Sequence, residues 1–139
     1  MSLQWREQLS VGNDLIDNDH KHLITIINQA EDTLATMNLS SLKSVLNSLA
    51  DYSKFHFARE EWVAGAAGFP QVPQLHQSHE ALIKKLTEVS QELDTELSET
   101  AAQNLVQFLR DWLINHVIKE DLMMKPFLTK FSPKFDPRR

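Results

Sequence analysis

The segment around residues 52–61 carries a histidine and a glutamate, His56 and Glu60, four residues apart in a long amphipathic stretch. Residues four apart in an α-helix project from the same face, so an imidazole nitrogen and a carboxylate oxygen can reach a common point. Flanking apolar residues fall on that face as well: Leu42, Val45, Leu46, Leu49 and Val63. The pair therefore lies on or beside the buried face, where a carboxylate is rarely found without a partner. A bound cation is the simplest partner for Glu60.

The composition restricts the chemistry of such a site. The chain contains no cysteine, so thiolate ligands, disulfides and cysteine nucleophiles are excluded, and any metal must be held by nitrogen and oxygen. A net charge of −5 argues against a nucleic-acid-binding surface, which requires clustered basic residues. The N-terminus lacks the apolar run of a signal peptide, and no stretch approaches the roughly 18 uncharged apolar residues of a membrane span. We therefore expect a cytoplasmic protein that binds neither nucleic acid nor membrane.

Helical periodicity predicts a single all-α domain over residues 1–139. Glycine is scarce, with three in the chain, which favours helices over a turn-rich β fold. The apolar spacing predicts an extended N-terminal arm at 1–17, helices at about 18–38, 40–64, 73–98 and 100–125, and a tail at 126–139. Short connections between four such helices predict an up-down-up-down four-helix bundle. Phe127, Leu128 and Phe131 of the tail either seal the bundle end or contact a second copy, so we expect a monomer or a weak homo-oligomer.

Each predicted helix brings one histidine to its buried face, and the four are His20, His56, His79 and His116. His22 is turned away from the buried face of its helix and is expected to face solvent. A single core histidine is more often a hydrogen-bonded structural residue than a ligand. Four of them, joined by the carboxylates of Glu60 and Asp121, indicate a nitrogen-and-carboxylate metal centre inside the bundle.

Several segments, in this order, make the chain resemble the hemerythrins, specifically the bacterial ones. They are Trp5 with Val11-Gly12, the run from Ile16 to Leu23, the run from His56 to Glu61, Phe69-Pro70, His79, and the run from Trp112 to Asp121. The resemblance implies two non-haem iron ions, bridged by two carboxylates and an oxo or hydroxo oxygen. Five histidines complete the coordination, and one open position facing an apolar pocket binds dioxygen. By this resemblance His20 and His56 would hold one iron, His79 and His116 would belong to the other, and Glu60 and Asp121 would bridge them.

The spacing between His116 and Asp121 does not suit a regular helix. Five residues correspond to about 140° around an ideal α-helix, so the two side chains would diverge. Both can face inward if the helix is locally widened into a π-bulge, or if they approach the metals from opposite edges.

The chain departs from the family pattern at position 75. The family places two histidines four residues apart on the third helix, which here correspond to Leu75 and His79, with His76 next to the first. If the first turn shifts the register, His76 and His79 could both act as ligands and restore the fifth histidine. If the helix is regular, Leu75 faces the second metal, which then binds more weakly, takes a water or is absent. The phase relative to His79 favours Leu75 facing inward.

A second departure is Ala64, where relatives commonly carry a larger apolar residue. The smaller side chain either widens the pocket or is compensated by Trp62. The sequence leaves both alternatives open.

Three classes of function fit this pattern. The first is a reversible dioxygen-binding di-iron protein for storage, delivery or sensing, which would not be an enzyme. The second is a redox enzyme, in which the position left open by Leu75 exposes iron to peroxide or nitric oxide. The third is a sensor or interaction module with one metal or none. A bundle with purely structural histidines would leave Glu60 and Asp121 without a counter-charge.

Overall fold

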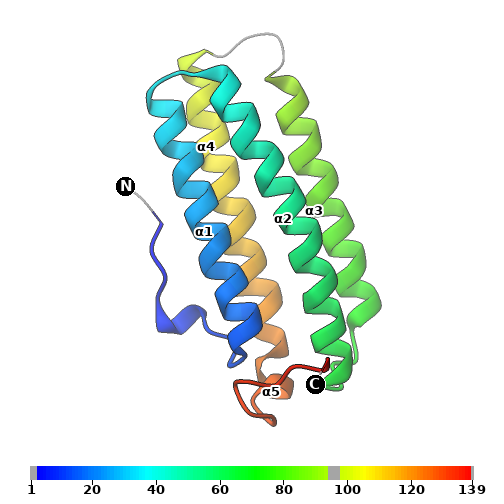
Figure 1. The fold of residues 1–139 in the computed structure, drawn as a ribbon. Coiled ribbons are helices and arrows are strands. Elements are labelled where there is room, and N and C mark those ends of the chain that lie inside the picture. The colour runs from blue at the N-terminus through cyan, green and yellow to red at the C-terminus, as the bar shows by residue number, and fades with distance from the viewer. Residues whose placement is uncertain (1–2, 94–97, 139) are drawn as a thin grey trace.

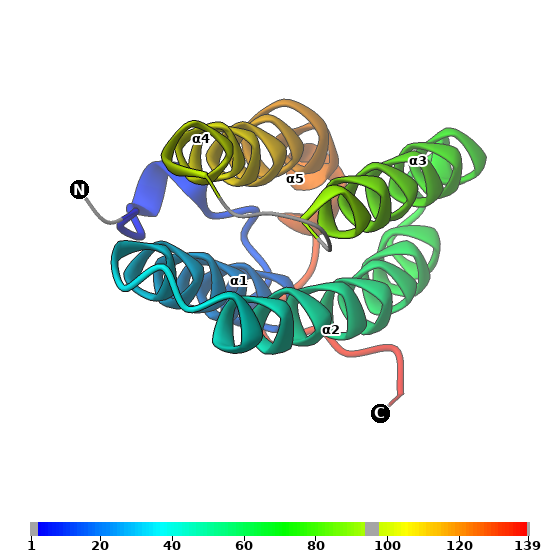
Figure 2. The ribbon, with the colours of Figure 1, turned by 90° about the horizontal axis from the view of Figure 1, so that it is seen from above.

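The computed structural model describes residues 3–93 and 98–138. Within these ranges there is no strand, and the long helices are α1 (Asp14–Ala35), α2 (Leu39–Ala66), α3 (Val72–Glu92) and α4 (Glu99–Ile114). They run alternately up and down (Figure 1), and α2 lies beside both α1 and α3, with α4 beside α1 (Figure 2). The expected all-α class and helical bundle are confirmed. None of the helices in the described part of the chain has both the length and the apolar character needed to cross a membrane.

The first helix begins earlier than predicted. Asn13, rather than the acidic residues from Asp17 to Asp19, is the N-cap, and its side chain accepts a hydrogen bond from the backbone N–H of Ile16. Asp17 instead accepts a hydrogen bond from the hydroxyl of Ser10 at 2.6 Å. This contact fixes the N-terminal arm, which contains the short turn η1 (Glu7–Leu9), against the start of α1. The predicted start at about residue 18 was too late. Asp17 is a polar residue that holds the arm, and it does not cap the helix.

Two other helix ends also differ from the predicted positions. Asn38, predicted to close the first helix, instead caps α2 by accepting from the backbone N–H of Ser41. Ser98 caps α4 by accepting from the backbone N–H of Ala101. The third helix was predicted to reach residue 98; α3 ends at Glu92, and residues 94–97 lie outside the described part of the chain.

The fourth helix changes type instead of ending. It continues as a π-helical turn, η2 (Asn115–Glu120), a 3₁₀ turn, η3 (Asp121–Met124), and the short α5 (Lys125–Leu128). Pro126 lies in the first turn of α5, where a missing N–H is tolerated, so it does not end the helical path as predicted. Leu128 is buried, and the ring of Phe127 packs edge-on against Phe69 with centroids 5.4 Å apart. This segment therefore seals one end of the bundle (Figure 1).

The C-terminal tail returns to the start of α1. The backbone N–H of Asp14 donates to the carbonyl of Pro133 at 2.7 Å. Gly12 has φ +81°, and a Cβ added there would lie 2.8 Å from the side chain of Thr129. Glycine is required at this close approach, both for its backbone conformation and for its lack of a side chain.

The buried apolar residues form two clusters along the bundle. The larger runs from Leu23 and Phe57 toward the far ends of the helices, and the smaller fills the end closed by α5. The smaller cluster consists of Val11, Ile16, Val63, Ala64, Ala67, Phe69, Leu75, Met124 and Leu128. Along α1, α2, α3 and the η2–η3 segment, buried histidines and carboxylates occur between members of the two clusters. A polar layer is thus enclosed by apolar packing on both sides, which keeps water from it.

Candidate metal centre

Five buried side chains bring their ligand atoms together inside this polar layer. One atom from each of His20, His56, Glu60, His116 and Asp121 lies within 4.8 Å of all the others. The fourth predicted histidine, His79, joins through Glu60: its Nε2 lies 3.0 Å from Glu60 Oε1. The four histidines and two acids that the sequence singled out are therefore neighbours, and all are at most 2% exposed.

Glu60 contacts all four histidines. Its Oε2 lies 2.9 Å from His56 Nε2 and 3.3 Å from His20 Nε2. Its Oε1 lies 3.0 Å from His79 Nε2 and 3.8 Å from His116 Nε2. One oxygen of the carboxylate thus faces one histidine pair, and the second oxygen faces the other.

Asp121 also contacts one histidine of each pair. Its Oδ2 lies 2.7 Å from His20 Nε2 and 3.2 Å from His116 Nε2. The reason that Asp121 and His116 both face inward is the π-helical turn from Asn115 to Glu120. A π turn adds a residue per turn relative to an α-helix, so side chains five apart share a face. This is the first of the two arrangements that the spacing allowed.

Within the described part of the chain, several of these buried atoms form no hydrogen bond despite their close neighbours. They are His56 Nε2, His116 Nε2 and both carboxylate oxygens of Asp121. The contacts to neighbouring atoms are short but lack hydrogen-bond geometry, because the lone pairs converge on common points. Buried polar groups without partners are costly, and convergent imidazole and carboxylate atoms are the donor set that iron, manganese or zinc accepts. The side chains present therefore fit bound metal ions.

The close approach of histidines and carboxylates in the layer shifts the pKa values of His20, His116 and Glu60. Burial lowers the pKa of His20, but its close contacts with the carboxylates of Asp121 and Glu60 outweigh burial and raise the pKa to about 9. Burial also lowers the pKa of His116, but the charge and close contact of Asp121 outweigh burial and raise this pKa well above its usual range. Burial raises the pKa of Glu60, but the charge of His56 and the histidine hydrogen bonds hold it well below its usual range. A cation bound here would displace protons from these histidines, which couples metal binding to pH.

Three further carboxylates, Asp19, Glu61 and Glu120, contact histidines of the cluster at Nδ1, the ring nitrogen that faces away from the centre. None of the three was among the predicted site residues. Asp19 Oδ2 lies 3.0 Å from His56 Nδ1. Glu61 Oε2 lies 2.8 Å from His79 Nδ1. Glu120 Oε2 lies 3.1 Å from His116 Nδ1. Such partners fix the orientation and tautomer of a ligand histidine and raise its basicity. Nδ1 of His20 is buried without a hydrogen-bond partner.

A sequence signal for these partners does exist. Asp19, Glu61 and Glu120 are each adjacent along the chain to a residue of the central cluster: His20, Glu60 and Asp121. Asp19 lies near the predicted start of the first helix, where an acidic residue is typical of a helix cap. It is instead held by the hydroxyl of Tyr52 at 2.8 Å, and its pKa is lowered because the hydrogen bond and charge of His56 outweigh burial.

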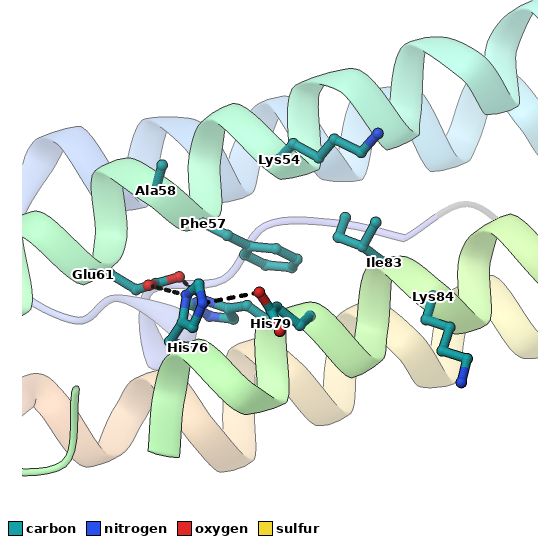
Figure 3. A pocket seen from close by; sticks show the side chains of 9 residues that line it. Lys54, Phe57, Ala58, Glu61, His76, His79, Ile83 and Lys84 are labelled. Atoms are coloured by element: carbon teal, nitrogen blue, oxygen red, sulfur yellow. Dashed lines mark hydrogen bonds and ion pairs between the residues drawn. The ribbon is translucent and has the colours of Figure 1, made fainter. Parts of the chain in front are cut away.

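Position 75 follows the regular-helix alternative. Leu75 is 6% exposed and belongs to the smaller apolar cluster. The side chain of His76 is 54% exposed, and its Nδ1 and Nε2 lie 2.6 Å from Glu61 and 3.0 Å from Glu80. Figure 3 shows His76 on the outer side of α3, bonded to Glu61. The structure therefore does not bring His76 into the cluster, because α3 keeps a regular register from Val72 onward.

Trp62 does not compensate for the small side chain of Ala64, which was one of the two predicted alternatives. Ala64 is fully buried in the smaller apolar cluster. Trp62 is 43% exposed, and the guanidinium of Arg138 lies 6.0 Å from its ring centroid. The larger side chain therefore faces away from the space beside Ala64, because residues two apart in a helix point to different faces.

Phe57 covers one side of the histidine cluster. Its ring stacks on His79 with centroids 4.0 Å apart and planes 5° apart. It also meets the rings of His116 and His56 at centroid distances of 4.8 and 5.5 Å. These contacts hold three of the four imidazoles in place and exclude water between them.

Comparisons with known proteins agree with this geometry. The family model described as the Hemerythrin HHE cation binding domain matches residues 11–128. The bacteriohemerythrin of Stenotrophomonas maltophilia (strain R551-3) is 30% identical over 119 residues, spanning 86% of this chain and 76% of that protein. That of Methylococcus capsulatus is 30% identical over 113 residues, spanning 81% and 86%. A crystal structure of wild-type hemerythrin superposes with a TM-score of 0.80 at 27% identity, covering 91% of this chain and 98% of the other.

Proposed function

Since the chain belongs to the hemerythrin family, we propose that it holds two non-haem iron ions and binds dioxygen reversibly, for storage, delivery or sensing. In this proposal His20 and His56 hold one iron, and His79 and His116 belong to the other. Glu60 and Asp121 reach both. The expectation that His76 is a ligand is not carried forward, because its ring is exposed and bonded to two other carboxylates.

The observation that carries the proposal is the position of Glu60. Its two oxygens each face a different histidine pair, at 2.9 Å from His56 and 3.0 Å from His79. A carboxylate that binds a single ion can do so with both oxygens on one side. A carboxylate that joins two ions needs one oxygen directed toward each of them. Asp121 also contacts one histidine of each pair, His20 and His116, through its Oδ2 alone.

The protein groups orient the ligands and keep the site dry. Iron bound here would supply the reducing electrons and the open coordination position that dioxygen binding requires. Asp19, Glu61 and Glu120 fix the rings of three histidines through their outer nitrogens. Phe57 and the two apolar clusters exclude water, which slows side reactions of the reduced centre.

One observation favours a second function, turnover of peroxide or nitric oxide. Leu75 provides no donor where the family pattern has a histidine, so an iron held by His79 and His116 would have one protein ligand fewer. An additional open position would admit a small reactant. Turnover with peroxide and a reductant, well above the rate of free iron, would support this function over reversible binding.

The test is an optical spectrum of anaerobically purified, iron-loaded protein before oxygen, after oxygen, and after oxygen is removed under argon. The proposal predicts bands that appear with oxygen and reverse under argon. Permanent oxidation in the first cycle, or no oxygen-dependent band, would overturn it. Glu60→Gln should abolish the bands, and Glu88→Gln, which changes an exposed glutamate on α3, should leave them unchanged.

A further inference from the structure

A groove between α2 and α3 borders the metal centre on its outer side, and the proposed function assigns no ligand to it. Its volume is about 460 Å³, and Phe57, Ala58 and Ile83 provide its apolar lining (Figure 3). His79 contributes to its floor, where the ring is stacked on Phe57. Small-molecule sites are typically concave, mostly apolar and about 300–1,000 Å³ in volume, with a few polar groups at the edge.

The acidic side chains at one end of the groove already have partners. Glu61 contacts the outer nitrogens of His76 and His79, at 2.6 and 2.8 Å. Glu80 lies 3.0 Å from the other nitrogen of His76. The two carboxylates at this end are therefore occupied by histidine nitrogens of the protein itself.

The basic side chains at the other end have no such partners. Lys54 and Lys84 line the groove from α2 and α3, and Figure 3 shows both at the end away from Glu61 and His76. Within residues 3–93 and 98–138, neither ammonium group forms an ion pair. Lysine side chains are flexible, so both can converge on one anionic group at the rim. The groove therefore combines an apolar body with a positively charged end.

We propose that this groove binds a small organic carboxylate, with its apolar body against Phe57, Ala58 and Ile83 and its carboxylate between Lys54 and Lys84. Such a ligand would contact the ring of His79 on the floor. The site does not depend on which metal the centre holds, or on whether dioxygen binds there. Its test can therefore succeed or fail independently of the proposed function.

The test is isothermal titration calorimetry of the protein as purified, with naphthalene-2-carboxylate and with its uncharged counterpart, naphthalene-2-carboxamide. The carboxylate is expected to bind once per chain with a dissociation constant below about 1 mM, the range typical of a ligand of this size. The amide should bind about tenfold more weakly, because it lacks the attraction of two exposed lysines.

Two sets of variants separate the apolar and charged parts of the site. Lys54→Gln with Lys84→Gln should weaken the carboxylate about tenfold and leave the amide unchanged. Ala58→Phe should fill the groove and abolish binding of both probes. Lys125→Gln, at an exposed lysine outside the groove, serves as the control. Circular dichroism verifies that each variant remains folded.

Several results would overturn the proposal. They are no saturable binding below about 1 mM, equal affinity for the two probes, or binding that neither set of variants alters. A dimer in sedimentation analysis that Ala58→Phe dissociates would show instead that a second copy occupies the groove.

Discussion

The two histidine pairs of the cluster differ in what surrounds them. His20 and His56 come from the adjacent helices α1 and α2, and their rings lie 4.8 Å apart between centroids. His79 and His116 are similarly close, at 5.0 Å, and both have an outer carboxylate. The second pair, however, lies on the side where Leu75 replaces the further histidine that the family pattern places there. The bundle thus keeps a regular α3 with leucine at position 75, while the two histidine pairs differ in the donor atoms within reach.

Replacing Glu60 should abolish iron binding at both histidine pairs, and with it any difference in iron affinity between them. Because Glu60 contacts all four histidines, Glu60→Gln removes a ligand from each half at once. We expect loss of nearly all bound iron, measured by elemental analysis after gel filtration. Glu88→Gln should retain the wild-type iron content. Retention of one iron in Glu60→Gln would show that the carboxylate serves a single half.

The pH dependence of the free energy of unfolding tests the raised pKa of His20, one member of the first pair. The pKa of His20 is raised from 6.5 to about 9, so the proton on His20 stabilises metal-free protein fully below pH 6.5. That contribution is lost as the pH rises through about 9, and it amounts to about 3 kcal/mol at 1.36 kcal/mol per unit. Urea unfolding at several pH values should show this decrease in the free energy of unfolding for wild type.

His20→Gln provides the matched variant for this experiment. It is less stable overall because Asp121 loses its partner at 2.7 Å. Its free energy of unfolding should nevertheless fall less steeply with pH between 6.5 and 9, since the residue that releases the proton is gone. Identical slopes in the two proteins would contradict the assignment of that proton to His20.

Substitutions of the outer carboxylates should weaken iron binding at one histidine pair without affecting the other. Asp19→Asn should weaken iron at the half of His56, and Glu61→Gln should weaken iron at the half of His79, each by about 10- to 100-fold. Asp51→Asn, at an exposed position of α2, should change neither affinity. Competition with a calibrated chelator measures both affinities. Equal weakening of both halves by either variant would mean that the two pairs do not act as separate sites.

Leu75→His should restore the missing ligand and reduce the difference between the pairs. The added imidazole replaces an inward-facing apolar side chain on α3 and should tighten the weaker iron by about tenfold, or about 1.4 kcal/mol. Without metal, the same change should destabilise the fold by about 1–3 kcal/mol, because it buries an unpaired polar group. Leu75→Met, which preserves the apolar packing, is the control. An unchanged affinity of the weaker iron in Leu75→His would refute this role for position 75.

The apolar periodicity of the sequence was sufficient to predict the bundle and the inward faces of His20, His56, Glu60 and His79. These residues lie in regular helices, where phase determines burial. Asp121 could not be placed in this way, because its inward direction depends on the π turn from Asn115 to Glu120. Periodicity alone does not reveal such a turn, and the resemblance to a family was needed.

The outer partners were not predicted, for a different reason, although each adjoins a residue of the central cluster in the sequence. Asp19, Glu61 and Glu120 are acidic residues on helices, and in a sequence they look the same as solvated surface acids. Only the packing of neighbouring helices shows that each faces a histidine nitrogen. At position 75 the phase favoured Leu75 facing inward, and its burial agrees. Whether the second iron tolerates this residue is a question of affinity rather than of fold.

An anaerobic titration of metal-free wild-type protein with ferrous iron, followed by calorimetry, measures the difference between the two pairs most directly. The account predicts two binding steps of unequal affinity, of which the weaker one disappears in His79→Ala while the tighter one persists. Two equally tight steps would show that Leu75 costs the second site nothing. A single step at every attainable iron concentration would contradict the di-iron centre itself.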